Sequence, residues 1–520
     1  MRFQSSRSFG LISIVIASIT CSGIGQDERT IGVTFIEEDI QPGYTLFSPQ
    51  NGMRNAYLLD ELGRVVQSWS SEYAPGLSTY LLETGQLLRT GNPGINDTIS
   101  GGGAGGQIER YSWDGELEWS FRYSTDLYRA HHDIEPLANG NILVIAWEYK
   151  TAEEALAVGR LPGTLPDALF PERIVEIEPI GTDEAEVVWE WHVWDHLIQD
   201  TDPSLPNYGN PADHPGRIDI NFRANNSADW LHCNGIDYNP ELDQIVLSLR
   251  AVDEIWVIDH NTTTEEAAGE AGDLLWRWGN PLAYGRGTVE DQKLFGQHDA
   301  KWIRPGMPGE GDITIFNNGN GRPGMQYSSI EQVTPPLMPD GTYMIEDGEP
   351  WGPTDVTWSY SSDPPGEFYA ARISGAQRQP NGNTLICQGT LGRFFEVDAN
   401  GNLKWNYINP LTGDGPLHQG DPPPGGGSGA SANRVFRAER YAPDFPGFAG
   451  RDMTPGDYLE IYPVCSGDVN NDRVVNGSDL TIVLGYWGTT NALADLDGSG
   501  QVDGGDLTVV LAHWGFCQDI

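Results

Sequence analysis

The chain has 520 residues, and 74 acidic against 30 basic residues give it a net charge of −44. Such a surface repels nucleic acid and anionic membranes, so neither is an expected partner, and a site for an anionic substrate must carry its own positive charge. Hydrophobic residues make up 38% of the chain, enough for a folded core, while 64 glycines and 35 prolines favour an all-β architecture with many turns.

The first residues form a predicted export signal. Two arginines in residues 1–7 precede a short apolar run at 9–19 and small residues at 22–25. This pattern is typical of a cleavable signal peptide, with cleavage expected after Gly25. Cys21 raises a lipoprotein as an alternative, although the usual small residue just before the cysteine is absent. No other stretch has the roughly 20 apolar residues that cross a bilayer, so we expect an exported protein, periplasmic, at the cell surface or extracellular.

A strand pattern recurs through residues 26–464, the expected first folded domain. A turn of the form x-G-x followed by an apolar strand occurs at 82–91, 138–149 and 380–389. Strands that carry tryptophan recur six times, at Trp69, Trp119, Trp189, Trp276, Trp358 and Trp405. Repeats of this size without convincing amphipathic helices predict a six-bladed β-propeller. The first tryptophan strand lacks earlier strands of its own, and the strand at 432–441 is expected to close the ring there. An array of β-sandwiches is the competing fold.

Histidines stand at the entrances of three predicted strands, within 131–134, 232–235 and 297–300. Aligning the first segment with the third places His132 over His298, each at the start of the strand that lines the channel of a propeller. Because side chains alternate along a strand, His232 and Asn234 face one way and Cys233 the other. By the same rule Asp299 points away from His298 and has an expected structural role. We expect the histidines to converge on the axis.

Converging imidazoles suit a metal centre, an oxyanion site or nucleophilic catalysis. Arg250 ends the strand that follows His232. A guanidinium is a poor neighbour for a metal dication and a good clamp for an anion, which favours the oxyanion. The glycine-rich segment 100–107 lacks the Lys-Ser/Thr pair of a phosphate loop and is interpreted as a flexible turn.

Four segments, 43–69, 131–148, 229–250 and 297–322, together resemble the bacterial arylsulfate sulfotransferases. The resemblance implies an exported six-bladed propeller that moves a sulfuryl group from a phenolic sulfate ester to another phenol, with no nucleotide sulfate donor and no catalytic cofactor. It implies that His298 is the sulfated nucleophile. The other catalytic residues that it matches are His232, one of His131 and His132, and Arg250. We prefer His132, because it aligns with His298, and we expect Asn234 to contact the substrate.

Two other functions compete with this interpretation. One is a non-catalytic propeller that binds ligands or partners. The other is a quinone-dependent dehydrogenase, since those enzymes are also tryptophan-rich propellers, but the adjacent cysteines expected of them are absent. Cys233 and Cys387 are far apart in the sequence and are interpreted as small buried hydrophobic residues.

The C-terminal segment, 465–520, contains a duplicated pattern at 467–488 and 494–515. In each copy, oxygen-bearing residues occupy loop positions 1, 3, 5, 9 and 12, and an apolar segment suited to a helix follows. These residues are Asp468, Asn470, Asp472, Asn476 and Asp479, then Asp495, Asp497, Ser499, Asp503 and Asp506. Hard oxygen ligands at this spacing predict two Ca²⁺-binding loop–helix units.

The aspartate at position 12, where an EF-hand has glutamate, makes this segment resemble a type I dockerin. The resemblance implies a cohesin-type partner. Cys465 and Cys517 bracket the duplicate, and an exported protein can keep such a pair as a disulfide.

Overall fold

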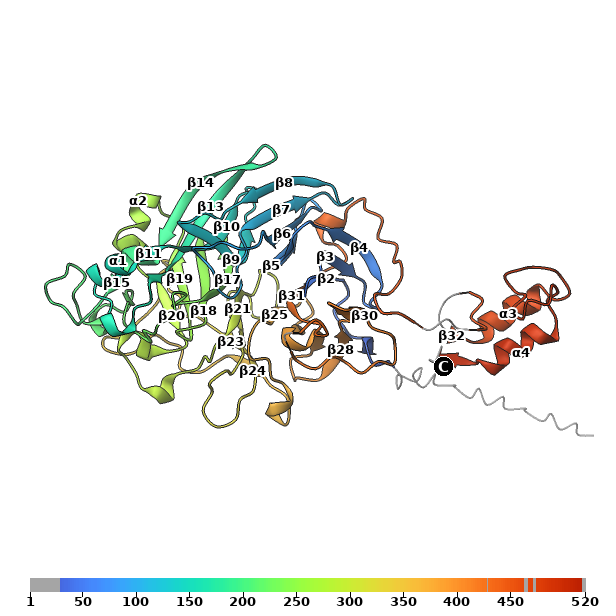
Figure 1. Ribbon diagram of the computed structural model, residues 1–520. Helices are drawn as coiled ribbons and strands as arrows, with labels where there is room; N and C mark the ends of the chain where they lie inside the picture. Colours follow the sequence, from blue (N-terminus) through green and yellow to red (C-terminus); the bar gives the residue numbers. More distant parts are fainter. Residues whose placement is uncertain (1–28, 428, 463–465, 471–473, 517–520) are drawn as a thin grey trace, which may run out of the picture.

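The structure is a computed structural model that describes residues 29–427, 429–462, 466–470 and 474–516. Six antiparallel sheets surround one axis and form a six-bladed β-propeller, as predicted (Figure 1). The expected signal peptide, 1–25, lies outside the described residues. Within the described ranges, no helix is long and apolar enough to cross a membrane.

Each blade contains four strands that run from the axis to the periphery. The first three blades are β31 (Val435–Tyr441), β2 (Tyr44–Pro49), β3 (Asn55–Leu59) and β4 (Val65–Ser70); β5 (Ala74–Leu81), β6 (Leu87–Asn92), β7 (Gln107–Tyr111) and β8 (Leu117–Arg122); and β9 (Tyr128–Pro136), β10 (Ile142–Glu148), β13 (Glu172–Ile180) and β14 (Glu184–His192).

The last three blades follow the same order. They are β17 (Cys233–Asn239), β18 (Gln244–Leu249), β19 (Glu254–Asp259) and β20 (Trp276–Trp278); β21 (His298–Trp302), β22 (Ile313–Asn317), β23 (Ser329–Val333) and β24 (Trp358–Tyr360); and β25 (Gly375–Arg378), β26 (Thr384–Gln388), β27 (Arg393–Val397) and β28 (Leu403–Ile408).

The two ends of the propeller chain close the ring. Strand β31 pairs antiparallel with β2, so the predicted closing strand at 432–441 is confirmed. The expectation that the first tryptophan strand lacks earlier strands is wrong, because β2 and β3 precede it and only the innermost strand comes from the far end. Sequence analysis did not foresee β1 (Gly32–Ile36), which adds a fifth strand to the last blade by pairing with β28.

The six repeated tryptophans lie on the fourth strand of each blade, counted from the axis, and connect each blade to the next. Each indole Nε1 donates a hydrogen bond near the turn between the third and fourth strands of the following blade. The bonds are Trp69 to Ser112 O (3.0 Å), Trp119 to Glu184 O (2.9 Å), Trp189 to Thr262 Oγ1 (3.3 Å), Trp276 to Gly352 O (2.9 Å), Trp358 to Ala399 O (2.9 Å) and Trp405 to Glu61 O (2.8 Å). The last of these joins the sixth blade to the first.

Burial explains the strand sequences. Strands β10, β18 and β22 are buried along their whole length, because neighbouring blades cover both faces of each sheet, and they consist mainly of apolar residues. The x-G-x turns that mark the repeats need a left-handed residue, and glycine supplies it at little steric cost. Gly85, Gly140 and Gly382 have φ values of +83°, +92° and +92°.

Short elements are inserted between the blade strands. In the third blade these are β11 (Lys150–Thr151), α1 (Ala152–Ala157) and β12 (Ala168–Leu169); β15 (Leu197–Ile198) and β16 (Ile218–Asp219) precede the fourth, and α2 (Thr264–Ala267) lies within it. A further small sheet pairs β29 (Leu411–Thr412) with β30 (Gly415–Pro416).

The C-terminal duplicate forms two helices, α3 (Gly477–Gly485) and α4 (Gly504–Ala512). Strand β32 (Val474–Val475) pairs with β33 (Gly515–Phe516). The two copies share a small core in which corresponding residues pack together: Val475 and Val502, and Val483 and Val510. The predicted helix after each acidic loop is therefore confirmed.

Candidate active site

The predicted histidines gather at one end of the channel, where the innermost strands begin. His131 and His132 lie in β9, His232 directly precedes β17, and His298 opens β21. The pairing of each of these strands with its neighbour shifts register near the histidine. His132, His232 and Asp299 have positive φ values of 50°, 54° and 54°, a backbone conformation that is costly for such residues and is concentrated at functional sites.

Asn318 fixes the tautomer of His298. The Asn318 amide nitrogen donates to the carbonyls of Ala370 (2.7 Å) and Ile373 (2.9 Å), so its Oδ1 faces His298 Nδ1 at 2.7 Å. An amide oxygen only accepts, so Nδ1 must carry the proton and Nε2 must carry the lone pair. In agreement, Nε2 accepts a hydrogen bond from the Ile373 N–H at 3.1 Å.

Burial and nearby positive charge keep His298 neutral. Only 2% of the residue is exposed. Burial is the main reason that the pKa of His298 lies well below its usual range, and the charge of Arg250 is the second. His298 therefore presents a neutral imidazole with an sp² lone pair, which is the nucleophilic form of histidine.

His232 has a charged partner instead of an amide. Its Nδ1 contacts Asp229 Oδ2, and the other Asp229 oxygen accepts a hydrogen bond of 3.1 Å from Trp147 Nε1. Burial acts to raise the pKa of Asp229, but the hydrogen bond and charge of His232 lower it below its ordinary value. An ionised carboxylate on Nδ1 favours a proton there and stabilises an imidazolium, which suits His232 to acid–base work through Nε2.

The structure separates the roles of His131 and His132. His131 stacks on Trp147 with ring centres 3.9 Å apart, and its Nε2 lies 2.8 Å from Glu172 Oε2. His132 instead has its ring 4.7 Å from that of His232. His132 is therefore the member of the pair that reaches the histidine cluster, as preferred from the sequence, and His131 supports it from behind.

A chain of hydrogen bonds connects Glu172, His131 and His132. The two imidazoles share a contact of 2.9 Å between their Nδ1 atoms, so one donates and the other accepts. Burial lowers the pKa of His131 to about 3 and raises that of Glu172 well above its usual range. The Glu172–His131 pair is thus neutral, and moving one proton along the chain switches His132 Nε2 between donor and acceptor.

Two polar atoms near these imidazoles are available to a ligand. Arg250 Nε and Asn234 Oδ1 are buried atoms for which the described residues supply no hydrogen-bond partner. The Arg250 backbone N–H donates to His232 O at 3.2 Å, which places Arg250 beside that histidine, as predicted. Burial lowers the pKa of Arg250, against the charges of Asp253 and Asp229, which act to raise it, and the charge of exposed Arg372 adds to the lowering. The site therefore has the local positive charge that an acidic protein needs to bind an anion.

The glycine-rich segment forms a wall of the histidine cluster and is more than the flexible turn expected from sequence. The Gly103 carbonyl accepts a hydrogen bond of 2.9 Å from the His132 backbone N–H. A Cβ placed on Gly103 would lie 2.2 Å from His132 Nε2, and one on Gly102 would lie 3.4 Å from His232 Cε1. Side chains are absent here because the backbone itself packs against the imidazoles.

An ion cluster occupies the channel beyond the histidines. Arg437 in the closing strand β31 makes ion pairs with Asp133 (2.8 Å) and Asp299 (2.7 Å). Tyr80 donates to the same Asp133 at 2.7 Å, and Asp299 also accepts from the Ala376 N–H at 2.8 Å. These contacts agree with the structural role expected for Asp299. They fill the axis, so the histidine cluster opens to one end of the channel.

Sequence reasoning missed Asn318, Glu172 and the Ile373 N–H. Asp229 carried a detectable signal, an acidic residue three positions before His232. Asn318 follows a buried strand but has no distinguishing pattern, and Glu172 lies 41 residues from His131 in the sequence. Cys233 and Cys387 are buried free cysteines, as expected.

The acidic loops at the C-terminus bring candidate metal ligands together. Oxygens of Asp495, Asp497 and Asp506 lie within 4.8 Å of one another, and Asp495 Oδ1 is a buried atom with no hydrogen-bond partner among the described residues. Asp506 and Asp479 accept backbone N–H bonds from their own loops, and Asp503 and Asn476 cap α4 and α3. Asp472, Cys465 and Cys517 lie outside the described residues.

Comparison with known families agrees with this arrangement. The family model described as "Arylsulfotransferase (ASST)" matches residues 37–414, and a "Dockerin type I domain" model matches residues 466–513. A match over most of the chain, on a six-bladed propeller with histidines at its axis, defines the class of protein. The chain belongs to the arylsulfotransferase family and carries a C-terminal type I dockerin domain.

No curated protein matches the chain. Solved structures similar to it include a protein of unknown function from Bacteroides caccae (11% identity, 71% of this chain and 94% of that one, TM-score 0.38). They also include a virginiamycin B lyase from Staphylococcus aureus (12%, 74% and 85%, 0.34) and a functionally unknown protein from Desulfotomaculum acetoxidans (6%, 77% and 100%, 0.35). Similarities this distant carry no information about substrate.

Proposed function

We propose that the protein is an exported arylsulfate sulfotransferase that moves a sulfuryl group from a phenolic sulfate ester to another phenol through a sulfohistidine at His298. The observation that carries the proposal is the pairing of a neutral His298, with its lone pair on Nε2, and the guanidinium of Arg250, whose buried Nε has no partner among the described residues. Membership of the arylsulfotransferase family supports the same reaction class.

In the first half-reaction, His298 Nε2 attacks the sulfur of the donor ester. The N–S bond forms as the S–O bond to the aryl group breaks, and the departing phenoxide takes a proton from the His232 imidazolium. Ionised Asp229 on His232 Nδ1 stabilises that imidazolium before the transfer. For attack to occur, the Ile373 N–H must leave Nε2, and it is then placed to donate to a sulfuryl oxygen.

In the second half-reaction, neutral His232 takes the proton from the acceptor phenol. The acceptor oxygen attacks sulfur, the N–S bond breaks, and His298 and protonated His232 are regenerated. Arg250 holds the sulfuryl oxygens, while the Glu172–His131–His132 chain lets His132 donate or accept as the charge on those oxygens changes. Because the channel is filled beyond the histidines, donor and acceptor use the same mouth and the kinetics are ping-pong.

The decisive experiment is turnover of a chromogenic aryl sulfate with and without phenol. Release of chromophore that depends on phenol supports transfer. Release that is unaffected by phenol indicates a sulfatase, and no release by the wild-type protein indicates a non-catalytic binding propeller. His298→Ala is expected to abolish turnover, and alkaline-quenched wild-type enzyme is expected to yield a sulfonated peptide containing His298 by mass spectrometry.

Arg250→Ala provides a second variant at the same site. Loss of a group that stabilises charge in the transition state typically slows a reaction by about 10²–10³-fold. His192→Ala is a matched control, because His192 lies at the end of the outer strand β14, bound to Glu148 and away from the axis. A His298→Ala enzyme that still turns over would move the nucleophile elsewhere.

The remaining parts of the chain fit an anchored, exported enzyme. We infer a signal peptide at 1–25, the catalytic propeller at 26–464 and a dockerin at 465–520 that binds two Ca²⁺ ions and a cohesin-type partner. The buried, unpartnered Asp495 Oδ1 supports a cation in the second loop, since a carboxylate oxygen is a ligand that Ca²⁺ prefers. A Cys465–Cys517 disulfide at the module's ends is tested by a mass shift on reduction and alkylation.

A further inference from the structure

A second pocket lies at the end of the channel opposite the histidine cluster. Strand β9 begins near His131 and ends at Glu135 and Pro136, which line this pocket. Strand β21 likewise runs from His298 to Trp302 in its wall. The pocket has a volume of about 720 Å³, within the range of roughly 300–1,000 Å³ usual for small-molecule sites. We call it the distal pocket.

The distal pocket is separate from the candidate active site. Arg437, Asp133 and Asp299 fill the axis between them, and Lys301 pairs with Glu439 in the same layer. A ligand in the distal pocket therefore does not reach His298, and the proposed transfer reaction assigns this pocket no role.

The walls combine apolar surface with an excess of acid. The second, third and fifth blades contribute Leu82, Leu88, Ile142 and Ile303, and Phe445 adds an aromatic ring. The charged lining residues are four glutamates and two arginines: Glu83, Glu135, Glu241, Glu310, Arg110 and Arg304. Apolar walls provide affinity for a hydrocarbon body, and the acid excess selects the sign of its charged group.

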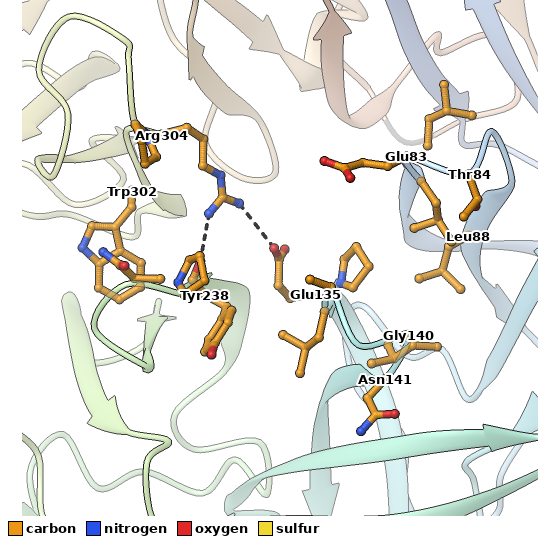
Figure 2. Close-up of a pocket in the computed structure, with 18 of the residues that line it drawn as sticks. Glu83, Thr84, Leu88, Glu135, Gly140, Asn141, Tyr238, Trp302 and Arg304 are labelled. Atoms are coloured by element: carbon orange, nitrogen blue, oxygen red, sulfur yellow. Dashed lines mark hydrogen bonds and ion pairs between the residues drawn. The ribbon is translucent and has the colours of Figure 1, made fainter. Parts of the chain in front are cut away.

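The positive charge of Arg304 is already committed to neighbouring groups of the protein. Arg304 donates to the Tyr238 carbonyl at 2.8 Å and to Asp237 Oδ1 at 2.6 Å, and it reaches Glu135 only at 3.3 Å (Figure 2). The Arg110 guanidinium carbon lies 5.9 Å from the centre of the Trp119 ring. Arg304 cannot hold an anion without giving up its contacts, whereas Arg110 Nε is a buried donor with no hydrogen-bond partner among the described residues.

The negative charge, in contrast, is incompletely balanced. Glu135 is 7% exposed, and burial with the nearby Asp237 raises its pKa well above the usual range, against the charges of Arg304 and Lys301. The Glu83 carboxylate is exposed, makes no hydrogen bond or ion pair with the other described residues, and points into the space shared with Glu135 and Arg304 (Figure 2). Asp133, behind Glu135, also acts to raise that pKa, although it is itself paired with Arg437.

We propose that the distal pocket binds an organic ammonium ion, a primary amine carried on an aromatic or aliphatic body. The ammonium group lies between Glu83 and Glu135, and the body packs on the apolar walls formed by Leu82, Ile142 and Phe445. An aryl sulfate or other anion is excluded, because the acid excess of the pocket adds to the net charge of −44.

The test is calorimetric titration of the full-length protein with 2-phenylethylammonium. Phenylacetate and 2-phenylethanol have nearly the same body with a negative charge or none. We expect saturable one-to-one binding of the amine, binding of the alcohol at least tenfold weaker, and no binding of the acid. Repeating the titration in buffers of different ionisation enthalpy should show proton release, as the amine favours ionised Glu135.

Two variants and two controls locate the binding. Glu83→Gln removes an exposed charge without affecting packing, and we expect it to weaken binding about fivefold; Glu135→Gln should weaken it more and abolish the proton release. Glu186→Gln, on the exposed face of β14, and His298→Ala should bind the amine like wild type. No amine binding, acid binding as tight as the amine, or unchanged affinity in both pocket variants would overturn the proposal, and the last would indicate general attraction to an acidic surface.

Discussion

Asn318 meets the proposed nucleophile through an uncharged group: its Oδ1 lies 2.7 Å from His298 Nδ1. The neighbouring imidazoles contact carboxyl groups instead, His232 through Asp229 and His131 through Glu172. An amide orients the ring without stabilising its protonated form. The uncharged partner thus sets His298 apart from His232, the histidine proposed to gain and lose a proton.

Replacing this amide with a carboxylate tests that distinction. In Asn318→Asp the new charge faces Nδ1–H and raises the pKa of His298, so the neutral form appears only at higher pH. We expect the acid limb of the pH dependence of kcat/KM for the donor to move upward, with activity partly restored at alkaline pH. Asn261→Asp, at an exposed position, is the matched control. A uniform fall in rate with an unchanged profile would show that Asn318 only packs against the ring.

Asp229→Asn should make the first half-reaction more dependent on the leaving group. Without the carboxylate, the imidazolium of His232 is less stable, and fewer molecules hold the proton that the phenoxide needs. Donors whose phenols have high pKa values should slow by about 10²-fold or more, whereas good leaving groups should slow little. A series of substituted aryl sulfates measures this as a steeper dependence of rate on phenol pKa. An equal loss for every donor would contradict a proton-donating role.

Gly103→Ala should impair the histidine cluster specifically. The added Cβ would lie 2.2 Å from His132 Nε2, at a residue with φ of +81°. Gly115→Ala is a close control, because its φ is +86° but nothing lies within 4 Å of the new Cβ. In both variants the positive φ should lower the free energy of unfolding by about 1 kcal/mol. Gly115→Ala therefore measures the backbone effect that the two variants share. Only Gly103→Ala should lose transfer activity, by tenfold or more; equal activity in the two would remove the segment from the site.

Trp405→Phe should loosen the closure of the ring. It removes the hydrogen bond of 2.8 Å from the last blade to the Glu61 carbonyl of the first, together with part of a fully buried indole. We expect a loss of about 2 kcal/mol in the free energy of unfolding by urea. Trp358→Phe breaks the equivalent bond at a partly buried position and should cost less. Equal losses of unfolding free energy would show that the closing hydrogen bond stabilises the propeller no more than the equivalent bond of Trp358.

Chelation should lower the thermal stability of the C-terminal module but not that of the propeller. We expect EDTA to remove the melting transition of the C-terminal module and leave that of the propeller unchanged, because the acidic loops repel themselves without a cation. Asp495→Ala should reduce the calcium content from two ions to one. Full calcium content in that variant, or a module that melts identically with EDTA, would contradict the proposed sites.

The blade repeats could be predicted from the sequence because short local patterns mark them. Turn glycines and the tryptophans mark each blade, and burial on both faces makes β10 and β18 continuous apolar runs. Strand β1 escaped detection because it is five residues long and has no tryptophan. Its place is set by pairing with β28, more than 370 residues away, rather than by its own pattern.

Of the candidate site, the sequence predicted the histidines and Arg250 but not the residues that hold them in place. Histidines at strand entrances and Arg250 could be placed by the repeat, because strand geometry fixes their direction. Asn318 and Glu172 act through contacts between different strands, and an isolated asparagine or glutamate in the sequence says nothing of its partner. The glycine-rich composition of residues 100–107 led to the wrong expectation of a flexible turn. At Gly103 the glycine instead allows the backbone to pack closely against an imidazole.

Strand β31 gives the site an order of assembly. The residues at 435–441 pair with β2 near the start of the propeller, and they carry Phe436 to His132 and Arg437 to Asp133 and Asp299. Until that strand arrives, Asp133 and Asp299 lack their ion pairs with Arg437, and His132 lacks its contact with Phe436. We therefore expect the nascent chain to lack transfer activity while five blades are already complete, and to gain it only when its last propeller strand pairs with the first blade.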